Sequence, residues 1–229
     1  MNVLSCLAPL LLPRLCPVCH RRLEHTEDSL CTLCASALPR LLLSGTSDNA
    51  MLRTLWTQVP LEHAFALLAY RHSSAFHRLL ERIKYQGDAD LALRLGRWVG
   101  REAARAGLDK QLDLLVPVPL APERERERGY NQAFLLAQGM AETMGLSVEC
   151  LLTRSSWRGS QTRLTALDRA RNAQALYRAS VPETLRGRSV ALVDDVMTTG
   201  STLRQCAEAL LAADPTMRVS VLTLAFAGE

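Results

Sequence analysis

The stretch "VALVDDVMTTGSTL", residues 190–203, places four apolar residues before two adjacent aspartates and a run of small hydroxyl residues around one glycine. The apolar residues predict a buried strand, and Asp194 and Asp195 stand at its carboxyl end. Charged pairs at the end of a buried strand are costly unless something binds them. The stretch therefore predicts a ligand site where a strand leads into a loop.

The loop after the aspartates has the chemistry of a phosphate cradle. A helix is predicted to begin near residue 201, and helix N-termini present free N–H groups and a partial positive charge. The glycine allows close approach of the backbone, and the hydroxyl groups add donors; the residues concerned are Thr198, Thr199, Gly200, Ser201 and Thr202. Two carboxylates would repel a phosphate, so we expect them to face sugar hydroxyls, with Mg²⁺ favoured nearby. A phosphorylated ribose would satisfy both parts of the motif, with its phosphate in the cradle and its hydroxyl groups on the aspartates. The alternative is that the segment is an ordinary N-capped helix after a strand.

The rest of the chain predicts the surrounding fold. Strands, among them one predicted at 146–152, alternate with helices from residue 112 onward, which predicts a parallel sheet with right-handed crossovers. Before that point, residues 62–71 have strand character, and residues 73–88 and 89–108 have the spacing of amphipathic helices. The length of 229 residues is enough for one α/β domain plus a small appendage.

Composition narrows the class of protein. Hydrophobic residues make up 48% and charged residues 22%, which is typical of a packed soluble core. The net charge of +4 is compatible with anionic ligands but too weak to require nucleic acid. No stretch reaches the roughly 18 apolar residues of a membrane-spanning helix, and Pro13 interrupts the apolar start, so we expect a cytoplasmic protein without a signal peptide.

Four of the seven cysteines form two C-x-x-C pairs separated by eleven residues. Two such knuckles complete a tetrahedral sulfur site, which suits Zn²⁺; the predicted ligands are Cys16, Cys19, Cys31 and Cys34. The alternative is reduced free thiols or a redox pair. We expect residues 1–60 to form a zinc-binding module with a loose connector over 35–60, and residues 61–229 to form the main domain.

The motif at 190–202 resembles the 5-phosphoribosyl 1-pyrophosphate (PRPP) motif of type I phosphoribosyltransferases, and the whole chain resembles the ComF/GntX family. The resemblance includes the four-cysteine block, "KYQGD", "VPVPLAPERERERGYNQA", "RSSWRGSQTRLTALDRARN" and the PRPP motif, in that order. It departs at "ADPT", 213–216, where the family often has a glycine turn and no site residue is affected. The resemblance implies an α/β, type I phosphoribosyltransferase-like parallel sheet with helices on both faces, plus a small N-terminal zinc-binding module.

The resemblance also implies roles for individual residues. Asp194 and Asp195 would hold the ribose hydroxyls, and the loop after them the 5′-phosphate. "KYQGD" would be the pyrophosphate loop, with Lys84, Tyr85 and Gly87 as PRPP-binding residues. The alternative for Lys84 is a solvated lysine at a helix end.

Two arginine-rich segments are expected to complete the site. Alternating Glu and Arg in "RERERGYNQ" is typical of a solvated loop, but Arg128 and Arg126 could instead reach phosphate, with Asn131 opening a helix. Residues 154–172 resemble the flexible lid of the family and carry Arg154, Gln161, Arg169 and Asn172, of which Arg169 is expected to bind PRPP. A lid would protect a ribosyl cation from water.

The expected function is Mg-dependent transfer of phosphoribose from PRPP to an unidentified acceptor. Such chemistry relies on positioning and charge neutralisation, so no Ser/His/Asp or Cys/His arrangement is expected. The alternative is a non-enzymatic PRPP-binding accessory protein in DNA uptake, because family members are linked to natural transformation or gluconate utilisation. Arg21, Arg22 and Arg40 could then meet single-stranded DNA or a partner protein, although only 5% of residues are aromatic. A zinc-mediated protein adaptor is a third possibility.

Overall fold

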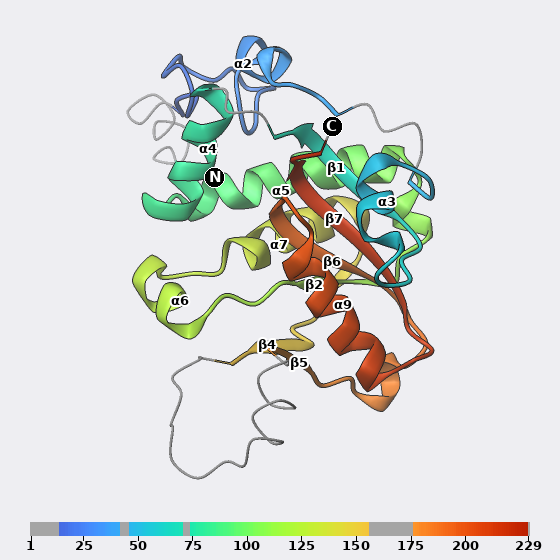
Figure 1. Ribbon diagram of the computed structural model, residues 1–229. Coiled ribbons are helices and arrows are strands. Elements are labelled where there is room, and N and C mark those ends of the chain that lie inside the picture. Colours follow the sequence, from blue (N-terminus) through green and yellow to red (C-terminus); the bar gives the residue numbers. More distant parts are fainter. Residues whose placement is uncertain (1–13, 42–45, 71–73, 156–175, 229) are drawn as a thin grey trace, which may run out of the picture.

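The computed structural model describes residues 14–41, 46–70, 74–155 and 176–228. Its centre is a five-stranded sheet in the order β1-β7-β6-β2-β3, and every neighbouring pair in it is parallel (Figure 1). The strands are β1 (Ala64–Ala69), β2 (Leu114–Pro117), β3 (Ser147–Val148), β6 (Ser189–Met197) and β7 (Arg218–Phe226). The two central strands, β6 and β7, are almost wholly buried, as expected for a sheet covered on both faces.

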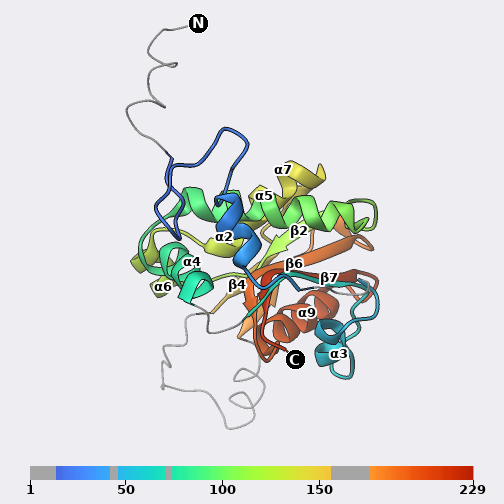
Figure 2. The same cartoon turned by 90° about the horizontal axis from the view of Figure 1, so that it is seen from above.

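Helices cover both faces of the sheet (Figure 2). In β6, Ala191 and Val193 pack into one core with residues of α4, α5 and α7, whereas Val190 and Leu192 pack into a second core with residues of α3 and α9. This alternation follows from the two-residue period of a strand. The helices are α3 (Ala50–Trp56), α4 (Ser74–Tyr85), α5 (Ala89–Arg105), α7 (Gln132–Met144) and α9 (Ser201–Ala213). The predicted fold class is therefore confirmed.

The order of the strands changes direction at the carboxyl ends of β2 and β6. From β2 the chain passes through α6 (Pro122–Arg128) and α7 to β3 at one edge, whereas from β6 it passes through α9 to β7 on the other side. The two connections leave in opposite directions, which makes the gap between β2 and β6 a topological switch point. Ligands of open α/β sheets bind at such points, and the aspartates of the opening motif lie on β6 there.

Three local predictions were wrong. Strand β6 runs through both aspartates to Met197, because β7 continues to pair with it as far as Phe226. The segment whose alternating charge is typical of a solvated loop, one of the two alternatives, contains the helix α6, with proline at its first position and Gly129 at φ 84° ending it. The single strand expected near 146–152 is divided into β3 and β4 (Leu152–Arg154), and β4 pairs antiparallel with β5 (Tyr177–Ala179) in a separate two-stranded sheet.

The connector before β1 is not loose where the structure describes it. The Asn49 side chain caps α3 by accepting a hydrogen bond from Leu52 N at 2.9 Å, and α3 buries Met51, Leu52 and Leu55. Leu41 N also donates to Leu67 O of β1 at 3.0 Å. Packing and capping therefore order a segment whose composition predicts a loop.

The cysteine block rests on α4 and α5. The Ser29 hydroxyl donates to Arg94 O of α5 at 2.8 Å, and Arg101 lies 3.8 Å from Asp28. Side chains of the block belong to the same buried cluster as those of the two helices; they are Cys16, Leu23, Leu30, Cys31 and Leu38. The domain boundary at residue 60 stays a prediction. Among the described residues, no helix combines the length and apolar character needed to cross a membrane.

Candidate functional site

The two aspartates of the motif point to opposite faces of the sheet because they are consecutive in β6. Asp195 is only 4% exposed and lies on the face covered by α4 and α7. Its Oδ2 atom lies 2.9 Å from Lys84 Nζ of α4 and accepts a hydrogen bond from Gln132 Nε2 of α7 at 3.3 Å. The structure thus joins the predicted pyrophosphate-loop lysine to the predicted ribose-binding acid, and the solvated alternative for Lys84 does not hold.

Asp194 lies on the face covered by α9. Its Oδ1 atom accepts a hydrogen bond from Asp195 N at 2.8 Å. Burial and the neighbouring charge of Asp195 raise the pKa of Asp194 to about 7, against the smaller opposing effect of that hydrogen bond and of Lys84 and Arg154. A ligand that brings hydroxyl donors or a cation to this carboxyl group would favour its ionised form.

A cavity of about 300 Å³ opens beside the Lys84–Asp195 pair and is lined by Lys84, Tyr85, Gly87, Arg124, Glu127 and Arg128. Arg128 Nη1 donates a hydrogen bond to Gln132 Oε1, and the Arg128 guanidinium lies 5.8 Å from the centre of the Tyr85 ring. Gln132 therefore bridges Arg128 on the cavity wall and Asp195 on the sheet. Lys84 and Gln132 thus connect the cavity to Asp195.

The loop after α4 has a fixed shape. Arg82 Nη2 lies 2.7 Å from Asp88 Oδ2, and Asp88 Oδ1 accepts a hydrogen bond from Leu91 N at 3.0 Å at the start of α5. Between them Gly87 adopts φ +70°, a conformation that favours glycine, and a Cβ atom there would meet nothing within 4 Å. Tyr85 is 80% exposed. Three predicted residues thus line one cavity: Lys84 and Tyr85 at the end of α4, and Gly87 in the loop after it.

The predicted phosphate cradle forms the turn from β6 into α9. Gly200 is the N-cap residue of α9 with φ +76°, and its hydrogen side faces the buried Leu55 of α3, so a Cβ atom would lie 2.5 Å from Leu55 Cδ2. Thr198, Thr199 and Ser201 are exposed around it. The turn follows Met197 at the end of β6, so its hydroxyl groups and the helix N-terminus stand at the switch point.

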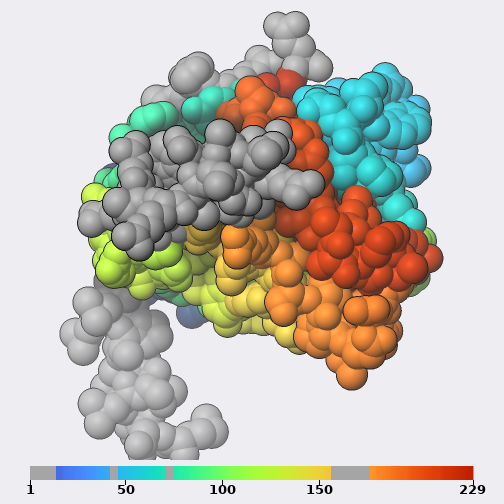
Figure 3. Space-filling model, turned by 60° about the horizontal axis from the view of Figure 1, so that its bottom comes forward, coloured from blue at the N-terminus to red at the C-terminus, as the bar shows by residue number. Residues whose placement is uncertain are grey.

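The β4–β5 hairpin places two more residues beside the cradle. Tyr177 is buried in the same core as Leu203 of α9, and this burial raises the pKa of its hydroxyl group. The Arg154 guanidinium lies 5.5 Å from the centre of the Tyr177 ring. Arg169, Gln161 and Asn172, predicted for the lid, lie outside the described residues. Figure 3 shows the surfaces of α6, in yellow-green, and of the chain from residue 176 onward, in orange, on the same side of the molecule.

Sequence reasoning missed Gln132 and Tyr177. Gln132 stands in the first turn of α7, where its type is unremarkable, and only the packing of α7 against β6 turns it toward Asp195. Tyr177 lies in a three-residue strand, too short for a periodic signal. Asn131 was expected to open a helix, and it does: its Oδ1 atom accepts a hydrogen bond from Ala133 N at 2.9 Å.

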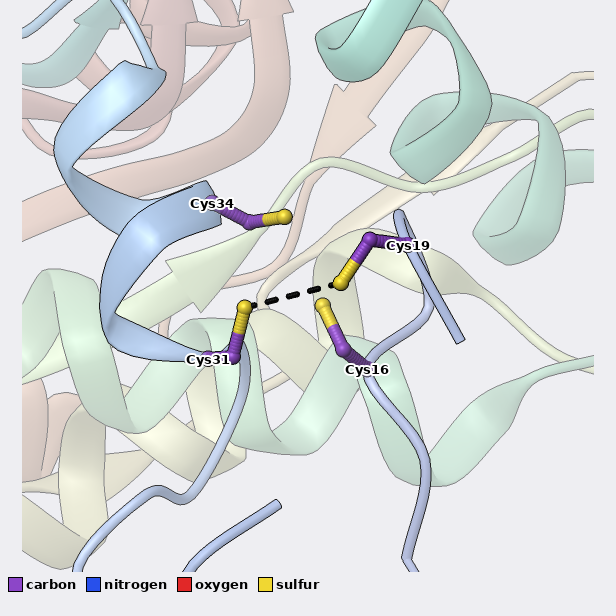
Figure 4. Close-up of side chains that lie close together, drawn as sticks. All are labelled: Cys16, Cys19, Cys31 and Cys34. Atoms are coloured by element: carbon purple, nitrogen blue, oxygen red, sulfur yellow. Dashed lines mark hydrogen bonds between the residues drawn. The ribbon is translucent and has the colours of Figure 1, made fainter. Parts of the chain in front are cut away.

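The four cysteines of the N-terminal block point toward one another, two from the loop at 16–19 and two from the start of α2 (Thr32–Ala37) (Figure 4). Their Sγ atoms all lie within 4.8 Å of one another, and those of Cys19 and Cys31 are 3.6 Å apart. A tetrahedral zinc site with bonds of about 2.3 Å places its sulfur atoms about 3.8 Å apart. The residues present therefore fit a four-thiolate metal site.

The backbone around the cysteines supports that arrangement. Cys16 N donates to Arg21 O at 2.7 Å and His20 N to Cys16 O at 2.9 Å, so the first knuckle closes on itself, with His20 at φ 59° in the turn. Burial raises the pKa of the Cys16 thiol, but hydrogen bonds from the backbone of Cys31, Cys19 and Val18 outweigh it and bring that pKa to about 7. Backbone donors of this kind stabilise a thiolate ligand.

Comparison with known proteins agrees with this geometry. Residues 131–229 match the family model described as "Phosphoribosyl transferase domain". The DNA utilization protein YhgH of Salmonella typhimurium is 30% identical over 214 residues, which cover 88% of this chain and 92% of that protein. This chain belongs to the ComF family of phosphoribosyltransferase-like proteins.

Two further relatives of this ComF-family chain carry competence in their names. The competence protein ComFC of Bacillus subtilis is 27% identical over 215 residues, covering 92% of this chain and 83% of that protein. The competence protein F of Haemophilus influenzae is 36% identical over 138 residues, covering 58% of this chain and 60% of that protein. The matches to YhgH and to ComFC each span most of both chains.

Proposed function

We propose that this protein binds PRPP together with Mg²⁺ at the switch point between β2 and β6 and transfers its phosphoribose to an acceptor. The observation that carries the proposal is the acid pair on β6, held by Lys84 and Gln132 on one side and followed by a glycine turn into the N-terminus of α9. A phosphorylated sugar with a diphosphate leaving group supplies one partner for each part of this arrangement.

Each group has a proposed task. Asp194 and Asp195 accept hydrogen bonds from the ribose hydroxyls, and residues 198–202 hold the 5′-phosphate through backbone amides and hydroxyl groups. Lys84, Tyr85, Gly87 and Arg128 face the diphosphate. Asp194 and Asp195 would also hold Mg²⁺, which would supply positive charge against the leaving diphosphate. In the reaction the C1–O bond breaks and the electron pair leaves with pyrophosphate, while a lone pair of the acceptor bonds to C1 and the acceptor proton passes to solvent.

On PRPP binding, the Lys84 ammonium group would have two anionic partners to face, Asp195 and the diphosphate. In the structure the Lys84 ammonium group is engaged with Asp195, and it also lines the cavity. When a sugar hydroxyl and a cation satisfy Asp195, the lysine is released to face the diphosphate. Arg169 would add a further PRPP-binding guanidinium group, and the cysteine block would hold structural Zn²⁺ on α4 and α5. A reducing compartment such as the cytoplasm would keep those thiols available for the metal.

Calorimetry with PRPP and Mg²⁺ tests the binding half of the proposal. The double variant Asp194→Asn, Asp195→Asn should lose PRPP binding, whereas Asp90→Asn, which removes an exposed carboxylate of α5, should not. Unchanged binding by the double variant would remove the site assignment. The catalytic half is tested by adding metabolite fractions to protein, PRPP and Mg²⁺ and measuring pyrophosphate, which should increase with the fraction that contains the acceptor.

The second candidate function is a PRPP-binding accessory protein that acts in DNA uptake or utilisation and contacts single-stranded DNA or a partner protein. The names of the relatives favour it, since they refer to DNA utilization and competence. Intact PRPP binding, combined with the absence of pyrophosphate release whichever fraction is added, would support this candidate. Contact with DNA through the cysteine block would show as single-strand binding that weakens steeply with salt and after Cys16→Ser. If the affinity for single-stranded DNA changes neither with salt nor with Cys16→Ser, the cysteine block has a structural role only.

A further inference from the structure

The cavity beside the acid pair carries an excess of positive charge that the proposed site residues do not fully explain. Its lining holds three cations, Lys84, Arg124 and Arg128, and one carboxylate, Glu127. Lys84 is paired with Asp195, and Arg128 donates to the neutral Gln132 and so keeps its full charge. Within the described ranges Arg124 makes no ion pair or hydrogen bond. An arginine fork facing a cavity without a partner is suited to bind an anionic ligand.

The geometry of α6 selects which of its arginines face the cavity. Arg124 and Arg128 are four residues apart and Glu127 is three from Arg124, so all three lie on one face of the helix. Arg126, two residues from each arginine, lies on the other side, where its Nε atom donates to Pro122 O at 3.3 Å and its Nη2 atom lies 3.9 Å from Glu123. The alternating sequence thus divides into a cavity face and a solvent face because the segment is helical.

We propose that Arg124 is a further substrate-binding residue that holds the diphosphate of PRPP together with Arg128, and that Glu127 limits the strength of this grip. The inference rests on the proposed function and extends it to a side chain of α6. A diphosphate presents several anionic oxygens, which two guanidinium groups can bind by paired hydrogen bonds. The open backbone at Gly87 and the Lys84 ammonium group face the same cavity. The Glu127 carboxylate repels the same anion and so favours release of the pyrophosphate product.

The test measures calorimetric affinity for three probes: metal-free inorganic pyrophosphate, PRPP with Mg²⁺, and ribose 5-phosphate, which lacks the diphosphate. Arg124→Ala should weaken pyrophosphate binding about tenfold, as expected for loss of one charge-assisted contact. Arg124→Lys should fall between that variant and the wild type, because charge without the fork is retained. Glu127→Gln should tighten pyrophosphate binding a few-fold. Arg126→Ala, the matched control on the same helix, should stay within about twofold of the wild type.

The outcomes separate this inference from the proposed function. Arg124→Ala should leave the affinity for ribose 5-phosphate unchanged, because the sugar and its 5′-phosphate contact other residues. Equal pyrophosphate affinities for Arg124→Ala and Arg126→Ala, or no pyrophosphate binding by the wild type, would overturn the role of Arg124. Failure of the wild type to bind PRPP and ribose 5-phosphate, with pyrophosphate still bound through Arg124, would instead overturn the proposed function alone.

Discussion

Lys84 Nζ lies 2.9 Å from Asp195 Oδ2, which joins the end of α4 to the middle of the sheet. The carboxylate is almost completely buried and the lysine side chain is one-quarter exposed. The chain has only two lysines, Lys84 and Lys110, among its 27 basic residues. One of the two is thus the direct partner of the acid at the switch point.

Replacing Lys84 by Met should cost both stability and ligand affinity. The variant leaves a buried carboxylate without its cation, which we expect to lower the free energy of unfolding by about 1–3 kcal/mol. PRPP affinity should decrease as well, because the cavity loses one of its three cations. Urea denaturation and calorimetry measure the two effects. Lys110→Met, at an exposed position, is the matched control. Equal stabilities and affinities for the two variants would show that the ion pair has no role.

Asp194 should make the stability of the ligand-free protein depend on pH. Its pKa is raised from 3.8 to about 7, chiefly by burial and then by Asp195, so the folded state retains a proton that the unfolded state has released in this interval. The stabilising contribution of this group is therefore complete below about pH 4 and is lost as the pH rises through about 7.

Urea denaturation at pH 5 and at pH 8 gives the difference in the free energy of unfolding between the two pH values. This difference should be smaller in Asp194→Asn than in the wild type. Asp48→Asn, at an exposed carboxylate, should retain the wild-type difference. Identical pH profiles for wild type and Asp194→Asn would contradict the assignment.

The fold was predictable from the sequence to the extent that strand and helix periods alternate. Buried runs such as 190–193 and 219–222 identify the central strands without any knowledge of their neighbours. The extent of β6 was not predictable, since the pairing of Met197 with Phe226 depends on the length of β7. Helix α6 was missed because strong alternation of charge concealed the signals of Pro122 and Gly129 at its ends.

The candidate site was predictable where one segment carries all its chemistry. The acids, the hydroxyl groups and Gly200 lie within one short segment, residues 194–202, so their types alone indicate a phosphate and a sugar. Residues that join the site through tertiary packing gave no such signal. Gln132 reaches Asp195 only because α7 packs on β6, and Arg124 faces the cavity only because α6 is helical.

Gly200→Ala should be more destabilising than an alanine at a comparable glycine elsewhere. Both Gly200 and Gly145 have positive φ, so each substitution carries a backbone strain of about 1–2 kcal/mol. At Gly200 the new Cβ atom would also lie 2.5 Å from Leu55 Cδ2, whereas at Gly145 it would meet nothing within 4 Å. Overpacking should therefore lower the free energy of unfolding by a further 1–3 kcal/mol or so at Gly200, about as much as overpacking costs elsewhere. Urea denaturation of the two alanine variants measures this excess. Leu55→Ala should lower the free energy of unfolding less in the Gly200→Ala background than in the wild type, because it removes the side chain that the new Cβ atom would meet. Additive effects of the two substitutions would show that α3 does not constrain the cradle.

Loss of one thiol from the cysteine block should remove zinc and weaken the packing on α4 and α5. Cys19 and Cys150 are both exposed, but only Cys19 belongs to the four-sulfur cluster. Purified wild-type protein and Cys150→Ser should contain about one zinc per chain by elemental analysis, and Cys19→Ser much less, because three thiolates leave the tetrahedral site incomplete.

The melting temperature of Cys19→Ser should fall by at least about 2–4 °C, equivalent to about 1 kcal/mol, since Leu23 and Leu30 share a buried cluster with the two helices. A strong chelator should lower the melting temperature of the wild type and of Cys150→Ser but not that of Cys19→Ser. Equal zinc contents in the two variants would exclude the four-thiolate site.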